Sequence, residues 1–335
     1  MPPDVAAGGA RRSDRDAGLD GDLVGVGFHG DLGGLACVRQ ADLDPLAAGH
    51  DSPAHWKHDP GTHSAAGPRS APPGYAWAMA RDRRREHLAE QVIWITPGWP
   101  PPRTAPSAAV AGELAGRAVI TQIGLAVWDI APGEAYDLAV EVNAVNTAAQ
   151  VRGLSRYHLF GFSAGATVAL AATLALGDAV QSLTLLEAAV IGDDDWHPAE
   201  TAFRARLAGV RALPAEQRIP ASRQLYVRPG EPLPPLGPPA PWDARDDMLE
   251  DMLAQVGFTS SDLAAITVPV LAISGGRSNP RFRLQDERLV EVISHARAEV
   301  FSERSHSSPP HKAESARLAE MLIDFWTRSA GTTTT

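Results

Sequence analysis

The sequence has one cysteine, Cys37, in 335 residues. A single thiol excludes an intrachain disulfide, and a lone cysteine is more often a small buried residue than a nucleophile. Long apolar runs are also missing, since none reaches the roughly 18 residues that a membrane-spanning helix needs. Arg11 and Arg12 are followed by Ser-Asp-Arg-Asp and not by an apolar stretch. We therefore expect no export signal and a cytoplasmic protein.

Positive charge is scarce as well. The formal net charge of −10 argues against a nucleic-acid-binding surface, which needs a basic face. What the chain does have is an ordinary hydrophobic fraction of 44%, enough to fill a sizeable core. The expected partner is a small-molecule substrate, with no nucleic acid and no membrane.

Residues 1–73 differ in composition from the rest. They are rich in Gly, Ala, Asp, Pro and His, which predicts a disordered or irregular N-terminal extension. Several of its side chains have the spacing of metal ligands: His50, Asp51, His55, His58, Asp59 and His63. Nearby prolines and glycines deny them a regular element that would orient them, so we expect no metal and no other cofactor.

From residue 91 onwards, short apolar segments alternate with helix-compatible ones. Strands are expected at 92–96, 118–121, 157–160, 182–186, 268–274 and 298–301, and helices at 107–115, 137–150, 164–176, 284–293 and around 318–325. Continuous apolar strands indicate a parallel sheet that helices cover on both faces. The sequence therefore predicts an α/β fold with a mostly parallel central sheet.

The alternation stops between residues 190 and 262. Charged helical pieces surround the Pro-rich run 229–241 there, and the alternation then resumes. We interpret 74–189 and 263–330 as one core, and 190–262 as a helical lid inserted into it. The lid's apolar side chains are candidates to line a substrate pocket: Trp196, Phe203, Leu207, Trp242, Met248 and Met252.

Residues 161–165 read Gly-Phe-Ser-Ala-Gly and match the Gly-x-Ser-x-Gly pattern. The match alone is weak in a chain with 30 glycines, but it lies between an apolar strand and an apolar helix. That is where a sharp strand-to-helix turn presents a nucleophilic serine, with small neighbours to avoid a steric clash. Ser163 is the candidate nucleophile, and an inert capping serine is the alternative.

A serine hydroxyl needs an adjacent base before it can attack at neutral pH. His306 follows the last predicted strand and so falls at the carboxyl edge of the sheet. His311 is the competitor, but its place at a helix start is typical of a solvated capping histidine. His158 lies inside a core strand, where we expect a structural role.

The acid that orients the histidine is less obvious. Many hydrolases of this architecture have a carboxylate after the strand predicted at 268–274, where this chain has Gly275-Gly276-Arg277. Glu187 directly follows the strand 182–186, on the same edge as Ser163, and can fix the histidine tautomer. The order Ser163, Glu187, His306 is the one expected for this type of site. A salt-bridged residue at a helix start is the alternative for Glu187.

Two backbone N–H groups are expected to stabilise an oxyanion. One belongs to Ala164, at the start of the helix that follows the nucleophile. The other is assigned to Trp99, in the loop after the first clear strand, on its position alone.

At these residues the chain resembles the α/β-hydrolase superfamily, over about residues 91–327. The nearest likeness is to actinobacterial-type members that carry Leu-Leu-Glu at a strand end and Ser-Asn-Pro after a later strand, here 185–187 and 278–280. The segment 306–311, with Pro-Pro-His at its end, is similar to that group's histidine loop. The usual His-Gly of the oxyanion loop is Pro97-Gly98 here. The resemblance implies a Ser-His-acid hydrolase whose acid follows the strand that ends at Leu186.

The expected activity is cleavage of an ester, thioester or lactone of a small hydrophobic substrate through an acyl-enzyme, as in carboxylesterases and lactonases. Two alternatives stay open. One is a non-catalytic binding protein of the same fold, and the other is a non-hydrolytic, haloperoxidase-like use of the same triad.

Overall fold

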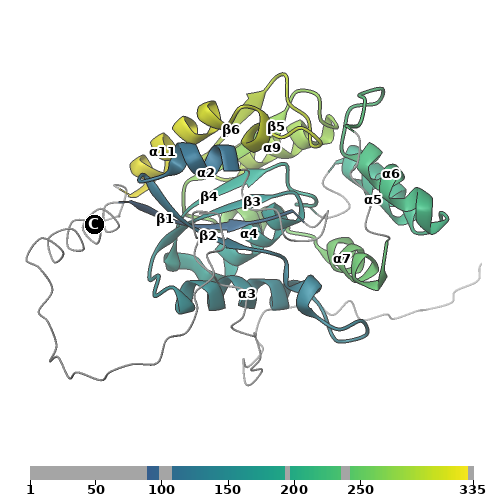
Figure 1. The fold of residues 1–335 in the computed structure, drawn as a ribbon, viewed down its shortest axis with the longest axis horizontal. Helices are drawn as coiled ribbons and strands as arrows, with labels where there is room; N and C mark the ends of the chain where they lie inside the picture. The colour runs from purple at the N-terminus through teal and green to yellow at the C-terminus, as the bar shows by residue number, and fades with distance from the viewer. Residues whose placement is uncertain (1–88, 98–107, 193–196, 235–241, 331–335) are drawn as a thin grey trace, which may run out of the picture. The chain divides into compact units, whose positions relative to one another are not determined.

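The computed structural model describes residues 89–97, 108–192, 197–234 and 242–330. The predicted extension 1–73 with its histidines, as well as Trp99 and Trp196, lie outside the described residues. Within the described ranges, six strands form one sheet in the order β2-β1-β3-β4-β5-β6, and every neighbouring pair is parallel (Figure 1). The strands are β1 (Glu90–Ile95), β2 (Ala118–Ile123), β3 (Tyr157–Phe162), β4 (Val180–Leu186), β5 (Val270–Gly275) and β6 (Ala296–Phe301). The predicted parallel α/β fold is confirmed.

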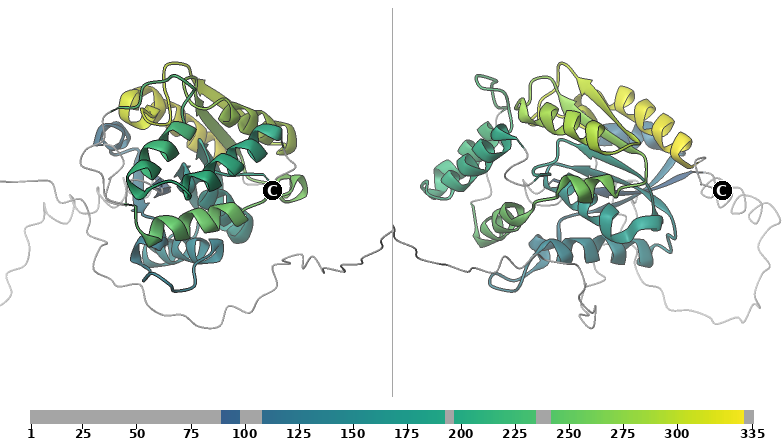
Figure 2. Two further views of the ribbon diagram at one scale, coloured as in Figure 1. Left: turned by 90° about the vertical axis from the view of Figure 1, so that its right-hand side faces the viewer. Right: turned by 180° about the vertical axis from the view of Figure 1, so that it is seen from behind.

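Helices cover both faces of this sheet (Figures 1 and 2). One face carries α2 (Ala108–Leu114) and α11 (Ser315–Ala330), which pack on each other. The opposite face carries α3 (Leu138–Val151), α4 (Ala164–Leu176) and α9 (Arg281–Val292). The short helices η1 (Ala126–Asp129), η2 (Gly177–Ala179) and α10 (Pro310–Ala313) lie in connections. No helix of the described ranges has the length and apolarity needed to cross a bilayer.

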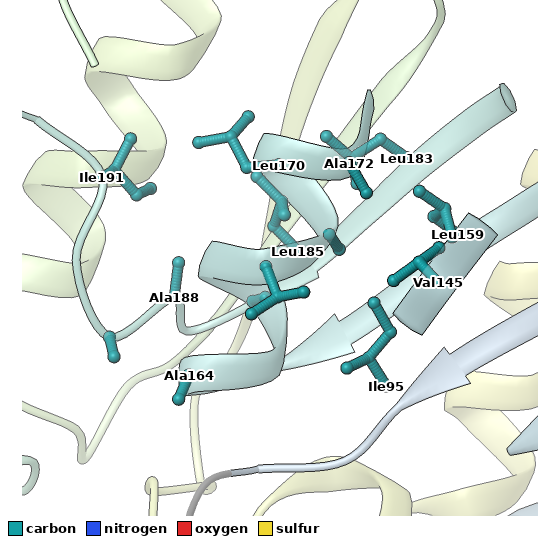
Figure 3. Close-up of a cluster of buried hydrophobic side chains, with 14 of the residues drawn as sticks. Ile95, Val145, Leu159, Ala164, Leu170, Ala172, Leu183, Leu185, Ala188 and Ile191 are labelled. Carbon is teal, nitrogen blue, oxygen red and sulfur yellow. The ribbon is translucent and has the colours of Figure 1, made fainter. Parts of the chain in front are cut away.

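Two-sided covering explains why the strands are apolar without interruption. All six residues of β3 are buried. Successive side chains of a strand point to opposite faces, so Trp94 of β1 joins the cluster under α2 and α11, while Ile95 joins the cluster under α3 and α4. Figure 3 shows the second cluster, in which Ile95, Val145 and Leu159 lie close together. Burial of such apolar surface is the main force that stabilises the sheet.

His158 is a buried polar side chain within the otherwise apolar strand β3. Its Nδ1 lies 2.8 Å from the hydroxyl oxygen of Ser182, and its Nε2 lies 3.1 Å from a carboxylate oxygen of Glu90. The imidazole also stacks on Trp326. Burial lowers the pKa of His158, against the opposing effect of Glu90. The predicted structural placement of this residue is confirmed.

Several predicted boundaries differ from the observed ones by a few residues, and two of these differences have a local reason. Helix α9 begins at Arg281 and not at Leu284, because the side-chain oxygen of Asn279 accepts a hydrogen bond from the Arg281 amide (3.0 Å) and satisfies an orphan donor there. Strand β5 begins at Val270, after Pro269, which has no N–H to give to a ladder.

Among the described residues, four helices lie between β4 and β5, in the region predicted as a lid and at its end: α5 (Pro198–Val210), α6 (Ala215–Leu225), α7 (Ala244–Gln255) and α8 (Ser260–Ala264). We call residues 190–262 the insertion. Helices α5 and α6 share a small apolar cluster that includes Phe203 and Leu225. Helix α7 instead packs into the main core through Leu249, Met252 and Leu253. The guanidinium of Arg204 donates hydrogen bonds to the carbonyls of Gly192 and Val256 and so ties α5 to both ends of the insertion.

Candidate active site

Ser163 lies at a sharp turn between β3 and α4. Its backbone has φ 58° and ψ −125°, a region that non-glycine residues rarely adopt. The turn is held by two backbone hydrogen bonds, since the Ser163 amide donates to the carbonyl of Leu186 (3.0 Å) and the Ala189 amide donates to the carbonyl of Ser163 (3.1 Å). The serine is 9% exposed.

The two flanking glycines are required by close backbone approach. A Cβ atom on Gly161 would lie 2.5 Å from the Cα of Ala166, and one on Gly165 would lie 2.7 Å from the carbonyl oxygen of Ile95. Both distances are far below an ordinary van der Waals contact. The pattern Gly-x-Ser-x-Gly is therefore the steric condition for bringing the start of α4 against the ends of β1 and β3.

His306 reaches Ser163 from the loop after β6. Its Nε2 lies 3.1 Å from the Oγ of Ser163, and its Nδ1 lies 2.8 Å from a carboxylate oxygen of Glu187. The side chain is 13% exposed. Three side chains that are far apart in the sequence thus meet in one hydrogen-bonded line at the carboxyl edge of the sheet.

Glu187 directly follows β4 and has φ 48°. Its amide donates to the carbonyl of Ile273 (3.0 Å), which continues the ladder between β4 and β5. Its carboxylate is almost completely buried, and the oxygen that does not face His306 accepts a hydrogen bond from the Gly275 amide (2.7 Å). Residues 188–192 are not helical, so the alternative of a helix-start residue is wrong.

The absence of a carboxylate after β5 has a steric reason. A Cβ on Gly275 would lie 2.7 Å from the carbonyl carbon of Arg304, and one on Gly276 would lie 2.8 Å from the Cα of Ser302. The loop that carries His306 therefore packs directly on these two glycines. A larger residue here would push the histidine loop away from the end of β5.

A second buried carboxyl group near Glu187 is that of Asp286 in α9. Burial raises its pKa well above the ordinary value, the nearby hydroxyl group of Ser274 opposes this, and the charge of Glu187 adds to the rise. The carboxylate hydrogen-bonded to His306 is that of Glu187, which makes Asp286 a natural comparison.

The N-terminus of α4 faces the nucleophile. Ala164 is the first residue of the helix, and its amide lies next to Ser163. The first amides of a helix carry partial positive charge, which favours an anion beside them. The Ala164 amide thus lies at a helix N-terminus beside Ser163, whereas Trp99, the other predicted oxyanion donor, is outside the described residues.

Three aromatic rings surround His306. The ring centroids of Tyr226, Phe162 and Phe282 lie 4.7, 4.9 and 5.2 Å from that of the imidazole. Neither Tyr226 nor Phe282 was predicted, because no periodicity of the sequence places the end of α6 or the start of α9 over the histidine loop. Ser278-Asn279-Pro280, which were noted only through the family resemblance, lie just before Phe282 and were the nearest indication in the sequence that this segment belongs to the site.

The expectation for His311 is wrong. The residue is 6% exposed and packs edge-on against Phe162 (5.1 Å) and Trp94 (6.3 Å), instead of lying in solvent. Burial, together with the charges of Lys312 and His306, lowers its pKa to about 3. A neutral ring suits this apolar position, which the strands β1 and β3 create from distant parts of the sequence.

The lid residues that were predicted to line a substrate pocket make packing contacts within the protein. Phe203 lies under the guanidinium of Arg281, 3.5 Å from ring centroid to Cζ, and contacts Tyr226 edge-on. The indole N–H of Trp242 donates to Asp247 (3.0 Å). Leu207 is buried in the insertion's own cluster, Met248 packs half-buried against the main core, and Met252 is buried in that core. Trp196 is outside the described residues.

A cavity of about 380 Å³ opens between α5 and α9. Its lining includes His197, Glu200, Gln285 and Arg288 but no member of the hydrogen-bonded line. It is therefore a separate feature from the surface beside Ser163. Among the described residues, no three His, Cys, Asp or Glu side chains converge in a way that would hold a metal ion.

Comparisons with known proteins give the fold. No protein-family model matches the sequence, and no curated protein matches it. Among solved structures, a candidate lipase (lip1) from Acinetobacter baumannii AYE superposes with a TM-score of 0.52 at 12% identity, over 80% of this chain and 100% of that chain. The carboxylesterase CesB from Bacillus subtilis gives 0.50 at 17% identity, over 71% and 83%. MGS-MChE2, an α/β hydrolase from a metagenome of Mar Chica lagoon sediments, gives 0.50 at 10% identity, over 72% and 91%.

Proposed function

We propose, since the chain has the α/β-hydrolase fold, that it is a serine hydrolase with Ser163 as nucleophile, His306 as base and Glu187 as orienting acid. The observation that carries the proposal is the unbroken line from Oγ to Nε2 (3.1 Å) and from Nδ1 to the buried carboxylate (2.8 Å). Both distances fall within hydrogen-bond reach before any substrate binds.

In the proposed mechanism each proton has a defined route. The carboxylate of Glu187 accepts a hydrogen bond from the Nδ1–H of His306, which leaves Nε2 free to take the proton of Ser163 as the oxygen attacks a carbonyl carbon. His306 then gives that proton to the leaving group as the bond between the acyl carbon and the leaving group breaks. A water molecule, deprotonated by His306, attacks the acyl-enzyme, and the returning proton regenerates Ser163. The carboxylate stabilises the imidazolium at each stage.

The negative charge that develops on the carbonyl oxygen needs donors. The amide of Ala164, at the start of a 13-residue helix, supplies one. We assign the second to the amide of Trp99 on the position of its loop after β1.

The surroundings of the base support our proposal for the substrate class. Rings of Phe162, Tyr226 and Phe282 lie around His306, so the base is set in apolar surroundings. An ester, thioester or lactone with a small hydrophobic acyl or alcohol part fits these surroundings. This corresponds to a carboxylesterase- or lactonase-like hydrolase.

The test is hydrolysis of a chain-length panel of p-nitrophenyl esters by the wild type and by Ser163→Ala. We expect activity only in the wild type, and labelling of Ser163 by a fluorophosphonate. Ser329→Ala is the matched control, because Ser329 is buried in α11, where its hydroxyl donates to Phe325. Equal rates for wild type and Ser163→Ala would refute the proposal. Absence of labelling would favour a binding protein of this fold, and labelling without hydrolysis would favour a non-hydrolytic use of the triad.

A further inference from the structure

The insertion contributes a ring to the surroundings of the catalytic base. Tyr226, the residue after α6, stacks on His306 with an interplanar angle of 23°. Phe282 of the core also stacks on His306, at 3°, and on Tyr226, at 6.2 Å and 25°. The three rings thus contact one another pairwise in nearly parallel planes.

Backbone hydrogen bonds fix Tyr226 in this place. The amide of Asn279 donates to the carbonyl of Tyr226 (3.1 Å), and the side-chain amide of Asn279 donates to the carbonyl of Leu225 (2.7 Å). Two residues after Tyr226, the amide of Arg228 donates to the carbonyl of Arg277 (3.0 Å). The segment 225–228 is therefore clamped to the loop after β5, close to the glycine whose amide contacts Glu187.

A buried ion pair between Arg281 and Glu200 also joins the insertion to the core. The guanidinium of Arg281 is 2% exposed and donates to Glu200 of the insertion (3.0 Å) and to the carbonyl of Ala189 (2.7 Å). Its carbon lies 4.5 Å from the ring centroid of Phe282 and 3.5 Å from that of Phe203. Removing one partner of such a pair leaves a buried charge, so this contact between insertion and core resists opening.

We infer that Tyr226 is a positioning residue that keeps the imidazole plane of His306 aligned between Ser163 and Glu187, so that the insertion completes the catalytic site instead of only covering it. The inference rests on the proposed function. Two hydrogen bonds and the covalent bond to Cβ hold the imidazole, but small tilts of its plane remain possible. The stacked rings of Tyr226 and Phe282 restrict that tilt, and an aromatic face accepts both a neutral imidazole and an imidazolium.

The test separates the ring from the hydroxyl. Tyr226→Leu removes the ring, Tyr226→Phe keeps it, and Phe258→Leu is the matched control, because Phe258 is another half-buried aromatic of the insertion that packs on the main core. We expect Tyr226→Leu to lower kcat about 10- to 100-fold with KM within about threefold, as for a misplaced catalytic group. Tyr226→Phe and Phe258→Leu should each keep kcat within about threefold of the wild type.

A second readout does not depend on activity. Stacked rings shift the proton resonances of His306 upfield, and ¹³C-labelled histidine with His306→Gln for assignment would identify these signals. We expect a downfield movement in Tyr226→Leu and none in Phe258→Leu. A rise in KM at unchanged kcat would overturn the positioning role in favour of substrate contact, and unmoved resonances would overturn the stack itself. If the wild type hydrolyses no ester, the proposed function fails, whereas the resonances still test the placement of Tyr226.

Discussion

Replacing Glu187 by Gln is the sharpest test of the triad, because both atoms that face this carboxylate are donors. One oxygen accepts from the Gly275 amide at 2.7 Å and the other faces His306 Nδ1 at 2.8 Å. A Gln side chain has one acceptor oxygen and one NH2 group. If the oxygen stays with Gly275, the NH2 group faces Nδ1 and forces the imidazole proton onto Nε2, where it blocks the transfer from Ser163.

The opposite orientation is also unfavourable. With the oxygen toward His306, the NH2 group would meet the Gly275 amide, and two buried donors would face each other without an acceptor. The wrong tautomer is therefore favoured, and the negative charge that stabilises the imidazolium is lost in either case. We expect kcat/KM to fall about a thousand- to ten-thousand-fold, which corresponds to roughly 4–5.5 kcal/mol of transition-state stabilisation.

The assay is single-turnover release of p-nitrophenol with Glu187→Gln, together with a thermal unfolding curve that checks folding. Asp286→Asn is the control, since Asp286 is a buried carboxyl close enough to Glu187 to feel its charge. We expect it to keep activity within about tenfold. The reasoning is refuted if Glu187→Gln stays within tenfold of the wild type, or if Asp286→Asn loses as much activity as Glu187→Gln.

Two predictions concern stability. Burial lowers the pKa of His311 to about 3, so below about pH 6.5 the unfolded chain binds a proton that the folded chain does not bind. This contribution to stability is therefore present above pH 6.5 and is lost as the pH falls, by about 2 kcal/mol between pH 7 and 5. Urea unfolding at both pH values should show that His311→Phe removes this loss, and an unchanged difference would contradict it. Gly161→Ala should cost about 3 kcal/mol, since the new Cβ would lie 2.5 Å from the Cα of Ala166. Gly112→Ala, in open space within α2, should instead stabilise by up to about 1 kcal/mol, and similar unfolding free energies for the two variants would contradict the steric argument.

Much of this molecule could be predicted from local sequence patterns. The strands were visible because a parallel sheet covered on both faces requires continuous apolar runs, as in β3. The turn at Ser163, the proposed nucleophile, was visible because it requires glycines at fixed positions. Glu187 could be predicted for a simpler reason: residues 275–277 contain no carboxylate, and Glu187 follows the neighbouring strand directly.

The remainder depends on contacts between distant segments. His311 was wrongly expected to be solvated, because its apolar surroundings come from Trp94 of β1 and Phe162 of β3, which are distant in the sequence. The start of α9 was misplaced because the cap is the side chain of Asn279, which also binds the insertion. Tyr226 gave no signal, since main-chain hydrogen bonds to the loop after β5 place it, and such bonds leave no trace in residue type.

Backbone strain gives an independent reason to assign Glu187 to the site. Among the described residues, the non-glycine residues with positive φ are Ser163 and Glu187. Each such conformation costs of order 1–3 kcal/mol and persists only where its surroundings enforce it. Here the ladder enforces it, because the amide of Ser163 donates to Leu186 and the amide of Glu187 donates to Ile273, each on the neighbouring strand. A carboxylate that served only a structural ion pair would not need this conformation, whereas one that must turn from the end of β4 toward a histidine beyond β6 does.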